Sequence, residues 1–194
     1  MKRFLGFTGT LLGTFLIVQL CATVPALAAS PDEQIAQAVT PLPEDLRAGA
    51  TVVVYDPASG ARKVLRQGTN TIECEPENLK DGFTRCYSNV NRPRREFEEK
   101  LRAEGKSDKE IQAAIDGAIK SGVLKVPPTG TMSYRLSSKD GVIKRLWIVS
   151  VPYATPEMLG VSTVSQRDAA LKGQGLPWMM LPGTAGAHIM IPIN

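Results

Sequence analysis

The chain has 194 residues and a formal net charge of +4 at pH 7, with one histidine and three cysteines. Lys2 and Arg3 lie in an N-terminal segment that we expect to be removed. Removal leaves 21 basic and 19 acidic residues in about 165 residues, the size of one domain. This near balance of charge argues against a nucleic-acid partner. The sequence also lacks Gly-x-Ser-x-Gly, Gly-x-x-x-x-Gly-Lys-Ser/Thr and His-Glu-x-x-His motifs, so the enzyme classes that these motifs mark are not supported.

Residues 1–29 have the features of a secretory signal peptide. Two basic residues precede an apolar, uncharged run over residues 4–20, and residues 26–29 (Ala-Leu-Ala-Ala) fit a small-residue cleavage site. A retained N-terminal anchor is the alternative, but Pro25 and the interrupted apolar run favour cleavage. Cys21 follows a bulky leucine, which does not suit a lipoprotein signal. We therefore expect a periplasmic or secreted protein with no transmembrane segment after cleavage.

Two cysteines remain in the mature chain, Cys74 and Cys86. In an oxidising compartment such a pair most simply forms a disulfide. A metal site or a redox pair is the alternative, but the spacing is far from Cys-x-x-Cys. The predicted disulfide would stabilise the fold by roughly 3 kcal/mol, because it closes a short loop in the unfolded chain.

Residues 49–75 predict the central hairpin of a β-rich domain. Residues 51–55 are rich in β-branched side chains, residues 56–60 (Asp-Pro-Ala-Ser-Gly) are typical of a turn, and residues 61–66 return as a second strand. Residues 71–74 are a plausible third short strand. The preceding residues 30–48 are expected to form an N-terminal leader with short helical turns.

Residues 93–122 predict a helical hairpin. Phe97 and Leu101 share one face of its first helix, and Ser107 with Glu110 forms a capping box at the start of the second. A single apolar stripe follows on that second helix, made by Ile111, Ile115, Ala118 and Ile119. We expect both stripes to lie against the sheet.

The remaining strands are predicted at residues 131–136, 142–151 and 187–191. Residues 142–151 are apolar on both faces, which is typical of a central strand that is covered twice. The fold class is therefore α+β, with a small antiparallel sheet of four to six strands, a helical hairpin packed on it and one disulfide. We expect residues 49–194 to form a single domain, with the hairpin inserted between strands.

The C-terminal segment carries a candidate metal site. On a strand, His188 and Met190 point to the same side, and Trp178, Met179 and Met180 lie on an arm that precedes a Pro-Gly break. Thioethers with one imidazole select Cu(I), and an indole can cap a cation. This set of ligands resembles those of small periplasmic copper-binding modules, without their order or fold. In the alternative interpretation methionine and tryptophan fill core space, and no cofactor is expected.

Arg92, Arg94 and Arg95 form a candidate anion-binding cluster. A helix N-terminus disfavours cations, so three arginines there break a local rule, and such breaks can mark function. A glycan, phosphate or lipid headgroup would fit guanidinium groups of this kind. The alternative is pairing within the chain, with acidic residues Glu96, Glu99, Glu73, Glu75 or Glu77.

These features favour an exported, non-catalytic module that binds a protein or a small ligand of the cell envelope. A periplasmic Cu(I)-binding protein is the second hypothesis. A carboxylate-dependent hydrolase of envelope polymers is the third, and it would need two carboxyl groups about 5–9.5 Å apart in a cleft. The sequence identifies neither the ligand nor the oligomeric state.

Overall fold

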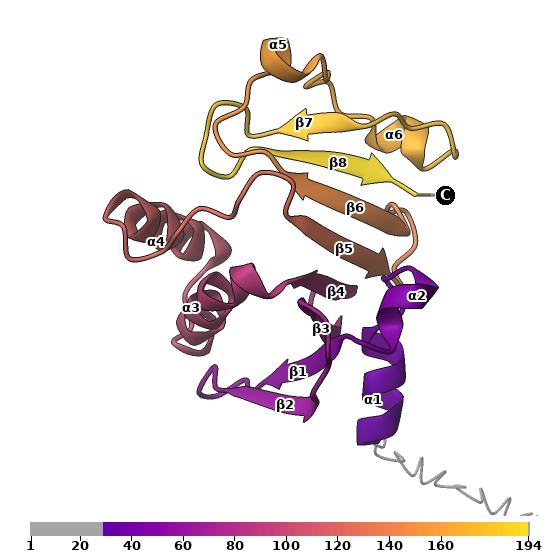
Figure 1. The fold of residues 1–194 in the computed structure, drawn as a ribbon, viewed down its shortest axis with the longest axis vertical. Helices are drawn as coiled ribbons and strands as arrows, with labels where there is room; N and C mark the ends of the chain where they lie inside the picture. The colour runs from indigo at the N-terminus through magenta and orange to yellow at the C-terminus, as the bar shows by residue number, and fades with distance from the viewer. Residues whose placement is uncertain (1–28, 194) are drawn as a thin grey trace, which may run out of the picture.

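One mixed sheet of eight strands organises the chain in the computed structural model, which describes residues 29–193 (Figure 1). The predicted signal peptide therefore lies outside the described residues, except for Ala29. The strands are β1 (Thr51–Tyr55), β2 (Arg62–Arg66), β3 (Ile72–Asn78), β4 (Phe83–Ser88), β5 (Met132–Ser137), β6 (Arg145–Ser150), β7 (Trp178–Met180) and β8 (His188–Pro192). Their order across the sheet is β2-β1-β3-β4-β5-β6-β8-β7. The α+β class is confirmed, whereas the expected four to six antiparallel strands are corrected to eight strands with one parallel pair, β1 and β3.

The β1–β2 hairpin lies at the edge of the sheet and not at its centre. Its turn forms as the sequence predicts, because Asp56 Oδ1 accepts the Ser59 N–H at 2.8 Å and Gly60 has a φ of 68°. After β2 the chain crosses back and adds β3 on the other side of β1, which makes this pair parallel. Strand β2 is rich in arginine and lysine, a composition that protects an exposed edge from further pairing.

The segment between the two cysteines is itself a hairpin of β3 and β4. Cys74 lies directly opposite Cys86 in the antiparallel register, and the two form the predicted disulfide. This hairpin supplies one of the strands that the sequence did not reveal. Polar and charged residues fill most of its outer face, so the sequence of residues 83–88 lacks the aliphatic residues that usually indicate a strand.

The helices lie on opposite faces of the sheet. They are α1 (Pro31–Ala38), α2 (Glu44–Arg47), the 3-10 turn η1 (Asn89–Asn91), α3 (Arg92–Ala103), α4 (Asp108–Lys120), α5 (Pro156–Leu159) and α6 (Arg167–Ala170). Helix α1 packs on β3 and β4 on the face that carries the disulfide, where the Cys86 sulfur lies 3.3 Å from the Ala38 carbonyl oxygen. Ala38, Leu42 and Val52 are fully buried there. The predicted leader thus contributes to the main core.

The helical hairpin is confirmed as α3 and α4, on the side of the sheet away from α1 (Figure 1). The capping box forms, with the Ser107 N–H donating to Glu110 Oε2 at 2.8 Å. The expectation that both apolar stripes lie against the sheet is wrong: the stripes pack against each other, with Phe97 and Leu101 against Ile111 and Ile115. The hairpin therefore has a small core of its own. Ion pairs connect it to the sheet, such as that of Arg95 on α3 with Glu75 on β3. Between residues 29 and 193, no helix combines the length and hydropathy needed to span a bilayer.

Candidate functional site: a cationic pocket between the helical hairpin and the sheet

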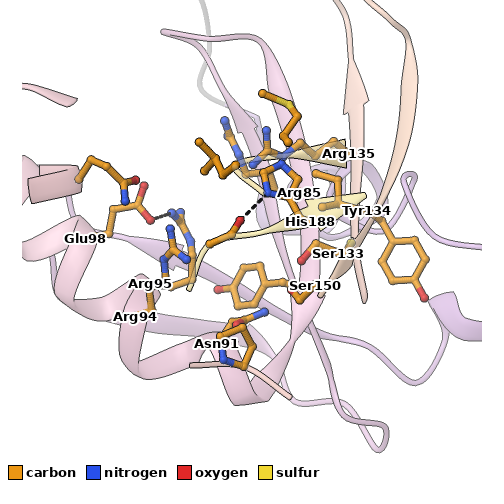
Figure 2. Close-up of a pocket in the computed structure, with 18 of the residues that line it drawn as sticks. Arg85, Asn91, Arg94, Arg95, Glu98, Ser133, Tyr134, Arg135, Ser150 and His188 are labelled. Atoms are coloured by element: carbon orange, nitrogen blue, oxygen red, sulfur yellow. Dashed lines mark hydrogen bonds and ion pairs between the residues drawn. The ribbon is translucent and has the colours of Figure 1, made fainter. Parts of the chain in front are cut away.

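A cavity of about 500 Å³ lies between the helical hairpin and the sheet face opposite α1 (Figure 2). Strands β4, β5, β6 and β8 form its floor, and α3 forms one wall. The antiparallel register arranges the floor in rows that run across the strands. One row begins with Arg85 opposite Arg135, the next contains Tyr87, Ser133, Ile148 and Met190, and the third contains Ser150, His188 and Met180.

Arg135 is the most unusual residue of the floor. Within residues 29–193 its guanidinium forms no ion pair and no hydrogen bond. It makes a cation–π contact with the Phe83 ring, with Cζ 5.9 Å from the ring centroid. Arg85 lies over the same ring, at 5.4 Å. Burial, reinforced by the charges of Arg85 and Arg95, lowers the pKa of Arg135 to about 10. The side chain is therefore still charged at neutral pH, in a place that disfavours its charge.

Arg94, from the first turn of α3, also lines the pocket and forms no ion pair or hydrogen bond with another described side chain (Figure 2). Its neighbour Arg95 is different. It binds both carboxylate oxygens of Glu75 on β3, at 3.0 and 2.7 Å, and also pairs with Glu98 and Glu99 of its own helix. Burial opposes the charged form of Arg95, but Glu75 and Glu98 outweigh it and raise the pKa well above the ordinary value. Arg95 thus fixes the hairpin to the sheet.

Arg92 lies outside the pocket. Its Nε donates to Glu73 Oε1 at 2.7 Å, and Arg62 of β2 binds the same oxygen at 2.9 Å. Glu73 is only 1% exposed, so these two arginines compensate a buried charge. Of the three arginines that the sequence grouped together, Arg92 and Arg95 form the ion pairs of the alternative interpretation, whereas Arg94 forms none among the described residues.

The carboxylates that line the pocket are all engaged with arginines. Asp81 pairs with Arg85, while Glu98 and Glu99 pair with Arg95 and Arg102. Burial raises the pKa of both Asp81 and Glu98, but their arginine partners outweigh it and hold each pKa below its usual value. A general acid of a glycosidase needs a raised pKa, so these carboxylates do not match that role.

His188 lies on β8 at the side of the pocket. Its Nδ1 is 2.8 Å from the Gly186 carbonyl oxygen, which can only accept, so Nδ1 carries a proton and Nε2 is left to accept. Burial lowers the pKa of His188, and the charges of Arg135 and Arg94 lower it further, although the bond to Gly186 partly offsets them. His188, Arg94 and Arg135 come from β8, α3 and β5, and all three line the same pocket.

The pairing of β7 with β8 places the predicted copper ligands. Met180 lies directly opposite His188, and Trp178 lies opposite Met190, all on the pocket face of the sheet. Met179 points to the other face, where it is buried beside Val151 and Ala187. Met190 and Trp178 belong to a packed apolar cluster. In the part of the chain that the structure describes, no three His, Cys, Asp or Glu side chains are grouped to hold a metal ion.

The rim of the pocket near β7 is apolar and strained. Met180 and Leu181 are 40% and 52% exposed, and they form an adjacent apolar pair at the edge of the pocket. Leu181 has a φ of 53°, a left-handed conformation that costs a bulky residue of order 1–3 kcal/mol. The tight β7–β8 connection requires this geometry, with Thr184 Oγ1 donating to the Leu181 carbonyl at 2.8 Å.

Sequence reasoning missed Arg85 and Arg135. A signal was present, because Met132, Tyr134 and Leu136 occupy one face of their strand and leave Ser133 and Arg135 on the other. An arginine on the inner face of a central strand needs a partner or a function.

The chain matches no protein-family model, and neither a curated protein nor a solved structure is significantly similar to it.

Proposed function

We propose that this protein is an exported binding module whose pocket holds a small ligand by its oxyanion, a carboxylate or a phosphate. The observation that carries the proposal is the pair of guanidinium groups, Arg94 and Arg135, which line one cavity from α3 and β5 and form no ion pair or hydrogen bond with a carboxylate among residues 29–193. An arginine that lies partly buried and unpaired is costly to the fold, and an anion would compensate it.

The neighbouring groups support an anion. Guanidinium groups bind carboxylate and phosphate through paired hydrogen bonds, and Ser133 and Ser150 add hydroxyl donors on the pocket floor. The cavity volume of about 500 Å³ falls in the range of small-molecule sites. The Cys74–Cys86 disulfide suits an oxidising compartment, in agreement with export. Mass spectrometry of the protein recovered from producing cells tests export, because the chain should then begin near Ala29 or Ser30.

Calorimetric titration with inorganic phosphate at low and at physiological ionic strength tests the site. The wild type should bind, and both Arg94→Met and Arg135→Met should weaken binding about tenfold or more, the usual effect of losing a charged hydrogen bond. Arg145→Met is the matched control, because it removes the same charge from the opposite face of the same sheet. Absence of binding, or an equal loss in the Arg145 variant, would overturn the proposal.

Cu(I) binding is the second candidate, and one observation favours it. The β7–β8 register places Met180 opposite His188, with Met190 two residues further on the same face. The charges of Arg135 and Arg94, which disfavour a proton on His188, would also disfavour a copper ion there. Competition with a chromophoric Cu(I) chelator in ascorbate distinguishes the candidates. Copper binding requires competition by the wild type that is lost in both His188→Ala and Met180→Leu.

A further inference from the structure

The lining of the pocket changes from charged to apolar along the sheet. At the β4–β5 end the floor carries Arg85 and Arg135, whereas on β6 and β8 it carries the apolar pair Ile148 and Met190, with Ser150 and His188 in the row beyond them. Met180 and Leu181 extend this apolar end to the protein surface. A free phosphate would occupy only the charged end and would leave Met180 and Leu181 exposed to water.

Building on the proposed oxyanion site, we infer that the ligand is an amphiphilic anion: a carboxylate or phosphate head at Arg94 and Arg135, with an aliphatic chain along Ile148, Met190, Met180 and Leu181. The exposure of Met180 and Leu181 supports this class. Two large, adjacent apolar side chains are held at the mouth of a cavity, and one of them has a strained backbone. Strained residues of this kind are concentrated at ligand-binding positions. A chain that covers them removes apolar surface from water.

Small apolar side chains complete the path for the chain. Ala185 and Pro127, the latter from the linker before β5, also line the pocket. Neither residue offers a side-chain polar group, so the polar side chains beside this path are those of Ser150 and His188. The class of ligand therefore includes fatty acids and single-chain phospholipid fragments, which share an oxyanion head and an aliphatic tail.

The test is a calorimetric series of butanoate, hexanoate, octanoate and decanoate, each kept below its aggregation threshold, with octyl phosphate as the alternative head. Affinity should rise about fourfold for each added methylene until the apolar end is filled. The double variant Met180→Gln/Leu181→Asn should flatten this rise and keep the binding of butanoate. Asparagine tolerates the left-handed conformation of position 181, so this variant should fold. Octyl phosphate and octanoate have the same chain length, so the lower of their two dissociation constants shows whether the pocket prefers a phosphate or a carboxylate head.

A matched control exists in the same chain. Met158 and Leu159 are also adjacent and exposed, at 70% and 41%, but they lie on α5 outside the pocket. Met158→Gln/Leu159→Asn should leave the whole series unchanged. Affinity that is independent of chain length, together with a phosphate site that is lost in Arg135→Met, would overturn the amphiphile and leave the oxyanion site standing. Absence of binding for every anion would overturn both.

Discussion

Replacing Arg135 by methionine should make the protein more stable while it weakens anion binding. The guanidinium lies partly buried beside Arg85 and Arg95, and these surroundings lower its pKa to about 10 from an ordinary value above 12. A fall of this size corresponds to roughly 3 kcal/mol against the charged form. Because the side chain is in part exposed and water screens it, and because the contact with Phe83 is lost, we expect a net gain of about 1–2 kcal/mol in the free energy of unfolding.

The same substitution at Arg95 should have the opposite effect. Arg95→Met leaves Glu75, Glu98 and Glu99 without their shared cation, and such a loss in a buried ion pair costs about 3–5 kcal/mol. Urea unfolding of the wild type and both variants, followed by far-ultraviolet circular dichroism, measures the two effects in one experiment. If Arg135→Met lowers the free energy of unfolding by 1 kcal/mol or more, Arg135 is a structural residue and the argument for a ligand at this position fails.

Three further predictions concern other parts of the molecule. The pKa of His188 is lowered in the folded state, so on acidification the unfolded chain takes up a proton at this residue before the folded chain does. The contribution of His188 to the free energy of unfolding is therefore present above about pH 6.5 and is lost as the pH falls through the lowered pKa. Urea unfolding at a series of pH values should show this dependence in the wild type and not in His188→Gln. The double variant Cys74→Ala/Cys86→Ala should lose about 3 kcal/mol, measured as a lower urea midpoint that reducing agent also produces in the wild type but not in the variant. Leu42→Ala should cost about 2–5 kcal/mol by calorimetric melting, because the side chain is fully buried, with phosphate affinity unchanged since it packs on the far face of the sheet.

The features that the sequence predicted well are those that a few neighbouring residues determine. The Asp56–Gly60 turn and the Ser107–Glu110 capping box each close within five residues, and both form as expected. The disulfide also follows from local chemistry, because two cysteines in an exported chain have few alternatives. The last strand was predicted at residues 187–191, whereas the strand β7 at Trp178–Met180 was not predicted.

The features that the sequence did not reveal depend on contacts between distant segments. Nothing local shows that β3 lies parallel to β1, since this pairing depends on which side of β1 the chain returns to. The arginine cluster could be recognised, but the free member could not be identified. Glu73 and Glu75 point to the face beneath α3, and they therefore engage Arg92 and Arg95 and leave Arg94 unpaired.

The position of the pocket follows from how the two parts of the fold are joined. The apolar core of the helical hairpin contains no strand residue, and the contact with the sheet depends on ion pairs such as Arg95 with Glu75. Arg94 on the hairpin and Arg135 on the sheet line the pocket between these two parts, and neither forms an ion pair among residues 29–193, although the charge of Glu98 acts on both. An anion bound by both arginines would connect the two parts, so its binding free energy would also hold the hairpin against the sheet. If the proposed anion binds there, the ligand should therefore raise the free energy of unfolding of the whole protein.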